Sequence, residues 1–181
     1  MQKLKFLAPA LSLIVITVGV AFLLSFVNSI TADRIVQNEI EEKTNAVQTI
    51  FPSLTKFENV DANLPQNVEE LGIVYGENSE QIGYFAKVSP IGFKDKVTMI
   101  VGVDNSSRVV SAVCLSSSET AGVGTKATAE DFLSEFIGQD KDASANHRTI
   151  TGATITSKAV RLGISKALEA VELIQGVKTN G

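Results

Sequence analysis

Four hydroxyl side chains lie within seven consecutive positions of this sequence, with two small residues between them: Thr151, Gly152, Ala153, Thr154, Thr156 and Ser157. Hydroxyl groups can donate hydrogen bonds to phosphate oxygens, and one of them can carry a phosphate as an ester. Glycine and alanine let the backbone approach such a ligand closely. The alternative is an ordinary helix N-cap, in which a serine or threonine needs no ligand. The pattern predicts one of these two structures.

The residues that follow predict a helix, because apolar positions recur at helical spacing: Val160, Ile164, Ala167, Leu168, Val171 and Ile174. Gly176 is the expected stop. The start of a helix presents unpaired backbone N–H groups and a partial positive charge, so it can hold a phosphate. We therefore interpret 151–157 as a loop that enters a helix near Ser157.

A second loop with chemical potential lies at 116–127, SSSETAGVGTKA. Its candidate ligand-binding residues are Glu119, Thr120, Gly122, Val123 and Gly124. The loop is too polar for a core and too rich in glycine to continue a strand, and such loops can bring backbone close to a flat or charged ligand. A flexible strand-to-helix connection is the alternative. Two loops of this kind in one small domain favour a binding site.

The elements that position these loops are short. Runs of β-branched and aromatic residues predict four strands, at 71–76, 81–88, 96–104 and 108–116. A short helix is expected from an N-cap at Thr128, with Asp131 in the capping-box position, to Gly138. The polar run QDKDASANH is expected to be an exposed loop, and the turn-rich run FENVDANLPQNVEE a connector. The fold class is α+β, with an antiparallel sheet backed by helices.

The first thirty residues predict a transmembrane helix. The stretch 6–27 is 22 residues of mostly apolar character, and no charged residue lies between Phe6 and Ala32. At about 1.5 Å per residue it spans a hydrocarbon core of roughly 30 Å. A signal peptide is the alternative, but its apolar region is usually about 7 to 15 residues long.

Charge around the span predicts the orientation. Lys3 and Lys5 precede it, whereas Asp33 and the acidic run NEIEEK follow it, so the N-terminus is expected in the cytoplasm. We expect a cytoplasmic N-terminus and transmembrane helix at 1–30, a helical stalk at 31–52 and an extracytoplasmic domain at 53–181. The chain would then be a single-pass protein of the cell (inner or cytoplasmic) membrane.

Composition excludes several functions. Of the 16 Lys and Arg residues, Lys3 and Lys5 precede the span, which leaves 14 against 20 acidic residues, so nucleic acid is not an expected partner. Cys114 is the single cysteine and His147 the single histidine, and neither zinc nor haem has its usual ligands. We expect Cys114 to be a buried thiol and His147 a surface residue. No catalytic residue and no metal site is expected.

Three segments carry a resemblance to a known family: SETAGVG at 118–124, TGATITSKAV at 151–160 and GYFAKVSPIGFKDKVTMIVGVD at 83–104. Together with one N-terminal membrane helix, they resemble the FMN-binding G subunit of the Rnf complex. They are also similar, less closely, to the C subunit of the sodium-pumping NADH:quinone reductase. The similarity covers essentially the whole chain.

The resemblance implies a covalent cofactor. Family members carry FMN as a phosphoester on the last threonine of a Ser/Thr-Gly-Ala-Thr-x-Thr pattern, which corresponds to Thr156. Gly152 and Ala153 would leave room for the phosphate and for the flavin transferase, and Thr154 and Ser157 would donate hydrogen bonds to it. The family's Glu-Thr-Pro-Gly-Leu-Gly loop matches 119–124 and is expected to lie along the isoalloxazine.

Three positions depart from the family pattern. Ala121 replaces a proline, and Ser117 stands where many members have histidine. Arg148 occupies a position that is usually aspartate, three residues before Thr151. A transferase that reads the acidic residue could recognise this site poorly, whereas an arginine could favour the phosphate by its charge.

The resemblance implies an electron-transfer subunit of an ion-translocating oxidoreductase. Such a complex moves electrons between reduced ferredoxin and NAD⁺ and couples them to Na⁺ or H⁺ transport. This subunit would relay electrons between an iron–sulfur centre of the membrane subunits and a second covalent flavin in the D subunit. Its expected partners are the A, B, C, D and E type subunits, the flavin transferase and the lipid bilayer. The alternatives are a membrane-tethered binding module without a redox cofactor and a flavin protein of another respiratory chain.

Overall fold

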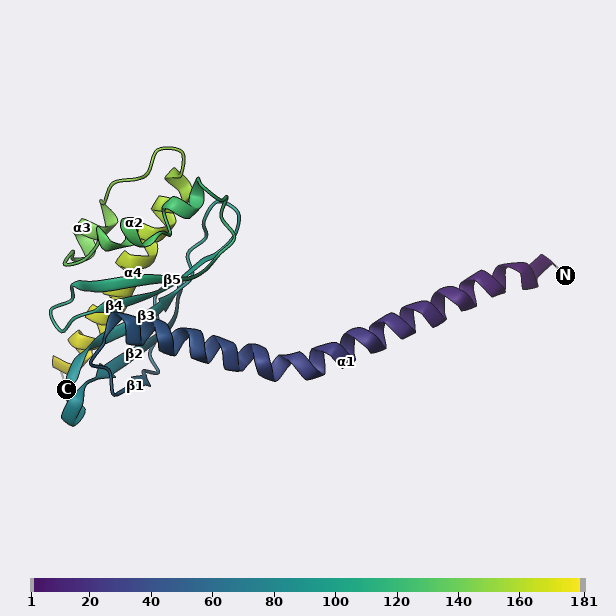
Figure 1. The fold of residues 1–181 in the computed structure, drawn as a ribbon, viewed down its shortest axis with the longest axis horizontal. Helices are drawn as coiled ribbons and strands as arrows, with labels where there is room; N and C mark the ends of the chain where they lie inside the picture. The colour runs from purple at the N-terminus through teal and green to yellow at the C-terminus, as the bar shows by residue number, and fades with distance from the viewer. Residues whose placement is uncertain (1, 180–181) are drawn as a thin grey trace. The chain divides into compact units, whose positions relative to one another are not determined.

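The computed structural model describes residues 2–179. By its internal contacts the chain forms two compact units, one up to Glu42 and one from Lys43 onward, and each is described by itself. The first unit is the greater part of helix α1, Gln2–Ile50 (Figure 1). Apolar side chains of this part are exposed, for example Phe22 and Leu24. Among the described residues α1 is the one helix long and apolar enough to cross a membrane, as a membrane anchor requires.

The second unit contains a five-stranded antiparallel sheet with the strands in sequence order (Figure 1). The strands are β1 Lys56–Asn59, β2 Val68–Tyr75, β3 Gln81–Val88, β4 Val97–Val103 and β5 Val109–Ser117. The predicted α+β class with an antiparallel sheet is confirmed, and β2 to β5 correspond to the four predicted strands. Strand β1 lies in the run predicted as a connector. It escaped prediction because it is a short edge strand whose single apolar residue, Phe57, packs edge-to-face on Phe85.

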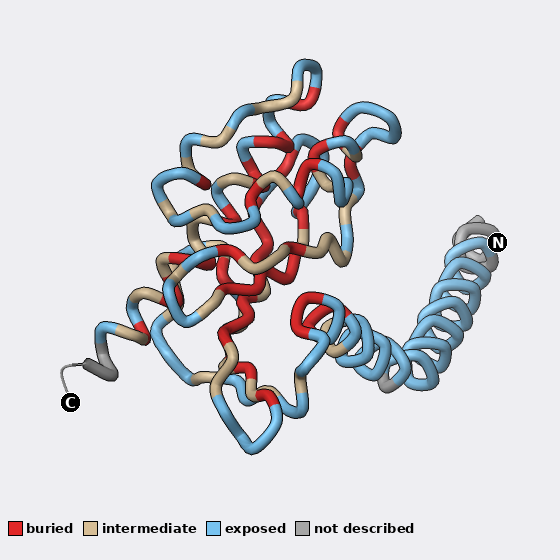
Figure 2. Tube along the Cα trace, turned by 60° about the vertical axis from the view of Figure 1, so that its left-hand side comes forward, coloured by how far each residue is buried: buried red, intermediate tan, exposed pale blue. Residues whose placement is uncertain are grey.

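Helices cover both faces of the sheet. On one face, helix α4, Thr154–Thr179, packs with helix α2, Glu130–Ser134, over strand residues such as Met99 and Val101. On the other face, the final residues of α1, Ala46 to Ile50, pack on Phe85 and Ile100. Figure 2 shows that the buried residues of this unit, in red, gather in its interior, whereas most exposed residues lie at its periphery. The central strands are therefore apolar on both faces.

The smaller helices differ from the predictions in three respects, the first of which is that α2 ends at Ser134 and not at Gly138. Helix α2 begins at Glu130 with Ala129 as its N-cap, and the Thr128 hydroxyl donates to the carbonyl oxygen of Thr125 at 3.2 Å instead of capping a helix. The run predicted as an exposed loop contains helix α3, Lys141–Ala145. Its start is fixed by Asp140, whose side chain accepts a hydrogen bond from Ala143 N at 2.9 Å.

Helix α4 also departs from the prediction at both ends. It begins at Thr154, not near Ser157, and it continues through Gly176 to Thr179. A glycine inside a helix costs about 1 kcal/mol relative to alanine, which weakens a helix without ending it. The described chain also contains two single-turn 3₁₀ helices, η1 Glu77–Ser79 and η2 Gly124–Lys126.

Candidate functional site

The two predicted loops meet at one pocket of about 390 Å³. Its walls come from the loop after β5, from the loop that enters α4 and from the turn between β3 and β4, and they comprise Phe93, Glu119, Thr120, Val123, Gly124, Gly152, Ala153, Thr154, Ile155 and Thr156. The volume is within the range of small-molecule sites, about 300–1,000 Å³. Two loops that are more than thirty residues apart in the sequence thus line the same cavity.

The first turn of α4 forms one wall of this pocket. Thr154 and Ile155 are exposed, whereas Thr156 is 1% exposed and lines the pocket from within the helix. Gly152 lies in the turn before the helix with φ at 84°, a conformation that favours glycine. The N–H groups of the first helical turn have no acceptor within the helix, so this wall offers hydrogen-bond donors to an anion.

Three of the predicted ligand-binding residues do not line the pocket. Ser157 is fully buried, and its hydroxyl oxygen accepts a hydrogen bond from the backbone N–H of Ile150 at 3.1 Å. The hydroxyl therefore holds the loop against the start of α4. Thr151 and Gly122 are exposed turn residues next to the pocket, and of the two only Gly122 has a left-handed φ, 73°.

Glu119 is the charged group in the pocket wall, and it is 7% exposed. One carboxylate oxygen, Oε1, accepts hydrogen bonds from the backbone N–H groups of Phe93 at 2.7 Å and Lys94 at 3.0 Å. The other, Oε2, accepts a hydrogen bond from Thr156 Oγ1 at 2.6 Å. Glu119 thereby joins the turn between β3 and β4 to the start of α4.

These contacts set the charge of Glu119. Burial raises the pKa of the carboxyl group, but hydrogen bonds from Thr156, Lys94 and Phe93, together with the Lys94 charge, outweigh burial and hold the pKa below its ordinary value. The group is therefore a carboxylate at neutral pH, and it is in direct contact with the Thr156 hydroxyl.

Glycine makes room for this carboxylate on two sides. A Cβ atom added at Gly124 would lie 2.6 Å from Glu119 Oε2 and 3.3 Å from Thr156 Oγ1. One added at Gly92 would lie 2.5 Å from Oε1. Gly124, which the sequence analysis selected as a candidate ligand-binding residue, is therefore needed to leave room for the Glu119 carboxylate.

The pocket also has an apolar side formed by three exposed side chains, Phe93, Val123 and Ile155. Phe93 is 63% exposed although it is a large aromatic residue. The sequence analysis did not select Phe93 as a site residue. The feature that could have identified it is an aromatic residue within the polar turn GFKDK. An apolar side opposite polar groups suits a flat aromatic ligand with a charged tail.

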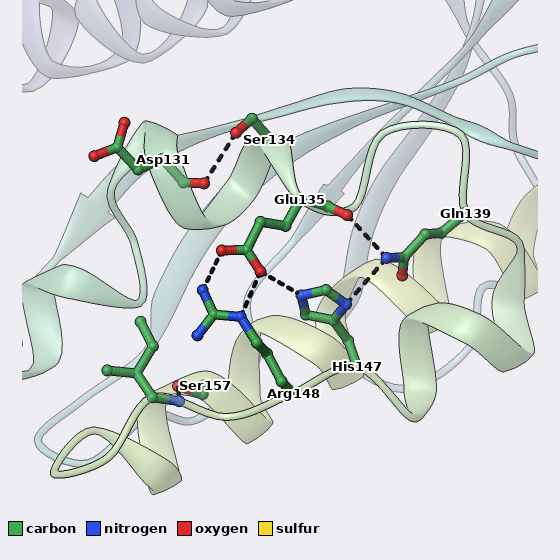
Figure 3. A network of polar contacts seen from close by, with 8 residues as sticks. Asp131, Ser134, Glu135, Gln139, His147, Arg148 and Ser157 are labelled. Atoms are coloured by element: carbon green, nitrogen blue, oxygen red, sulfur yellow. Dashed lines mark hydrogen bonds and ion pairs between the residues drawn. The ribbon is translucent and has the colours of Figure 1, made fainter.

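A second polar network braces the segment that leads into the pocket (Figure 3). Glu135 accepts hydrogen bonds from Arg148 Nε at 2.7 Å and from Arg148 Nη2, and its Oε2 lies 3.0 Å from His147 Nε2. The prediction that His147 is a surface residue is wrong. Its side chain is 14% exposed, since the ring lies 4.3 Å from the Phe136 ring and its Nδ1 contacts Gln139 at 3.0 Å.

Arg148 is directed into this network. Its guanidinium group binds Glu135 and lies over the Phe132 ring, 5.6 Å from the centroid, and it does not line the pocket. The hydrogen bond with Glu135 raises the pKa of Arg148. The structure therefore explains the residue as an anchor of the segment to α2. The single cysteine, Cys114, is half-buried at the edge of the core, where burial raises the pKa of its thiol.

Fold and pocket define a class of protein. Residues 92–169, which include both loops, match the FMN-binding domain family. The chain is 30% identical to the G subunit of the Na⁺-translocating ferredoxin:NAD⁺ oxidoreductase complex of Acetobacterium woodii, an alignment that covers 90% of this chain and 89% of the relative. It is 25% identical to the G subunit of the proton-translocating ferredoxin:NAD⁺ oxidoreductase complex of Clostridium ljungdahlii, over 82% of each chain. It is 26% identical to the G subunit of an ion-translocating oxidoreductase complex of Stutzerimonas stutzeri, over 93% of this chain and 81% of the relative.

Each of these alignments covers more than four fifths of this chain. The chain belongs to the family of Rnf complex G subunits, which contain an FMN-binding domain.

Proposed function

We propose that this chain is a membrane-anchored flavoprotein that carries FMN as a phosphoester on Thr156 and relays electrons within an ion-translocating ferredoxin:NAD⁺ oxidoreductase complex. The observation that carries the proposal is the pocket itself, in which the 119–124 loop and the start of α4 meet around the Thr156 hydroxyl. Family membership supports the assignment of the ligand as FMN.

The residues present fit this cofactor. Phe93, Val123 and Ile155 provide an apolar side for the isoalloxazine, and the volume suits a ligand of this size. The exposed hydroxyl of Thr154 and the free N–H groups at the start of α4 can bind the phosphate. The negative charge of Glu119 would oppose a phosphate, but each of its oxygens already accepts at least one hydrogen bond.

FMN, when bound, can take up and release single electrons, and the protein supplies position and electrostatics. In this chain, helix α1 anchors the protein in the membrane and the pocket holds the FMN in position. The exposed Phe93 and Val123 at the rim leave the ligand close to the surface, where electrons can pass to a neighbouring subunit. We place the domain on the extracytoplasmic side, because the charges around the span favour a cytoplasmic N-terminus.

The partners follow from this role. We propose that the chain assembles with the A, B, C, D and E type subunits of the complex, and that a flavin transferase attaches the FMN during maturation. A covalent bond keeps the cofactor in place outside the cytoplasm, where a dissociable one would be diluted.

Replacement of Thr156 tests the proposal. The full-length chain is produced with a flavin transferase, separated on a denaturing gel and examined for flavin fluorescence, and its intact mass is measured. We expect the unaltered chain to carry one FMN, Thr156→Ala to carry none, and the matched control Thr154→Ala to carry FMN. A fluorescent Thr156→Ala band would move the attachment point to another hydroxyl, and an unaltered chain without flavin would overturn the proposed function.

A further inference from the structure

The hydroxyl groups in the pocket wall differ in one respect. Thr120, Thr154 and Thr156 all line the pocket, and of these three it is Thr156 whose hydroxyl donates a hydrogen bond to a carboxylate. The donor–acceptor distance of 2.6 Å lies within the range of about 2.5–2.7 Å for a hydroxyl bonded to an ionised acceptor. Proximity to a base is therefore a property of this hydroxyl and not of the threonine-rich loop as a whole.

The remaining contacts of Glu119 leave Oε2 free for this hydroxyl. Oε1 is held by the backbone N–H groups of Phe93 and Lys94, which fix the carboxylate from the side opposite Thr156. Neither donor is an ionised group, so the negative charge of Glu119 is not neutralised by an ion pair of the kind that Glu135 makes. A carboxylate oriented in this way can accept a proton.

We propose that Glu119 is the general base for attachment of the flavin phosphate, so that the acceptor chain supplies a catalytic residue for its own modification. This inference rests on the proposed function. In the step, Thr156 Oγ attacks the phosphorus of a riboflavin 5′-phosphate that is activated as an anhydride with a second nucleotide. The Oγ–P bond forms, the P–O bond of the anhydride breaks, the second nucleotide leaves as its monophosphate, and the hydroxyl proton moves to Glu119 Oε2.

The same proton transfer balances the charge in the pocket. Attachment places a phosphodiester, with one negative charge, next to Glu119. The carboxyl group loses its own negative charge at that moment, because it has taken the proton from Thr156. It then has an O–H group that can donate a hydrogen bond to the new phosphate. A carboxylate beside the acceptor hydroxyl therefore assists the reaction, and its charge does not exclude the anionic product.

The Glu119→Gln variant tests whether Glu119 acts as a general base or has only a structural role. The amide oxygen can still accept the hydrogen bonds from Phe93 and Lys94, and the amide N–H can reach Thr156 Oγ1, so the contacts are kept while the direction of the last one is reversed. The full-length chain in detergent is incubated with a purified flavin transferase and flavin adenine dinucleotide. Flavin incorporation is followed by intact mass over time at several acceptor concentrations.

We expect the maximal rate of incorporation to fall by about 100-fold or more in Glu119→Gln, the usual size of a general-base effect, with the half-saturating acceptor concentration unchanged. The matched control Glu135→Gln, which alters a carboxylate that does not line the pocket, should stay within twofold of the unaltered chain. A Glu119→Gln rate within threefold of the unaltered chain would overturn the proposal. So would a loss that lies wholly in the half-saturating concentration, since that would make Glu119 a recognition residue.

A second measurement applies if Glu119→Gln does not fold. The incorporation rate of the unaltered chain is measured between pH 6 and 8 and normalised to hydrolysis of the dinucleotide by the transferase alone. A rate that is independent of pH supports a base that is already ionised, whereas a tenfold rise per pH unit contradicts it. If the unaltered chain never gains flavin, the proposed function fails; if it gains flavin and Glu119→Gln gains it equally fast, only this inference fails.

Discussion

Two carboxylates flank the segment that enters α4, and their surroundings differ. Glu119 is almost fully buried and is held by two backbone N–H groups and a hydroxyl, all of them neutral donors. Glu135 has a side chain that is 31% exposed, and it is held by the guanidinium group of Arg148 and by His147. Both groups have a lowered pKa, but the causes are different.

For Glu135 the hydrogen bond from Arg148 is the largest cause of the lowered pKa. Its charge is compensated by a cation, and it anchors the loop to α2. For Glu119 burial opposes the lowered pKa, and hydrogen bonds from neutral donors overcome it together with a smaller contribution from the Lys94 charge. The three groups that hydrogen-bond to its carboxylate are a hydroxyl and two backbone amides, and the hydroxyl is that of the proposed attachment residue, Thr156.

Gly124→Ala is the variant expected to disturb Glu119 most while leaving Glu135 unchanged. The added Cβ atom would lie 2.6 Å from Glu119 Oε2 and would displace the carboxylate from Thr156. We expect flavin incorporation to fall by about tenfold or more, since general-base catalysis contributes about 10²–10⁴-fold and requires hydrogen-bond contact. Incorporation is measured by in-gel fluorescence and intact mass.

The control for this variant is Gly176→Ala, which lies inside α4 where an added Cβ meets no atom within 4 Å. It should leave incorporation unchanged and stabilise the helix by about 0.5–1 kcal/mol. If Gly124→Ala incorporates flavin as well as the unaltered chain, the loop accommodates the added Cβ atom without displacing Glu119. The close packing of Gly124 against Glu119 would then not be required for flavin attachment.

Glu135→Gln should show the opposite profile. It removes the charge that Arg148 and His147 contact, and because the site is partly exposed we expect a loss of about 1 kcal/mol, or about 3–5 °C in Tm. Incorporation should remain within twofold, because the network does not line the pocket. Thermal unfolding of the full-length chain by circular dichroism measures the first effect.

A matched control for this variant is Glu169→Gln, which removes a partly exposed pair with Lys166 on the surface of α4. It should cost less than about 0.5 kcal/mol. If Glu135→Gln instead slowed flavin incorporation as strongly as Glu119→Gln, the distinction between a reactive and a bracing carboxylate would be lost.

Much of this arrangement could be predicted from local sequence patterns. Strands β2 to β5 are runs of β-branched and aromatic residues, and both pocket loops are marked by their glycines and hydroxyls. The contact between Glu119 and Thr156 could not be predicted, because it joins positions 37 residues apart and depends on how the sheet brings two loops together. The resemblance selected both residues but gave no reason for their proximity.

The errors share one physical cause, which is that tertiary contacts outweighed local composition. Helix α3 and strand β1 are polar segments, stabilised by the ion pair of Lys141 with Glu172 on α4 and by pairing with β2. His147 is polar by type, yet two phenylalanine rings and Glu135 cover most of its side chain. Arg148, which departs from the family pattern, forms an ion pair with Glu135 that could not be predicted from the sequence.

The smallest effect concerns acid stability, and it distinguishes the two carboxylates without any flavin. Because both have a folded-state pKa below that of the unfolded chain, each contributes stability that is fully present above the unfolded pKa and is lost as the pH falls through the folded pKa. The free energy of unfolding should therefore decline on acidification, by at most about 1.4 kcal/mol per pH unit for each group.

Glu119→Gln and Glu135→Gln should each make this decline less steep, and the double variant should flatten it further, because the two sites share no partner. Urea unfolding of the full-length chain at a series of acidic pH values gives the slopes. The effects of the two variants on this slope should depend differently on salt concentration. The Glu135 contribution comes from exposed contacts with cations, which salt screens, whereas the hydrogen bonds from buried neutral donors to Glu119 are screened little. Equal salt sensitivity of the two slopes would contradict the assignment of neutral partners to Glu119 and ionic partners to Glu135.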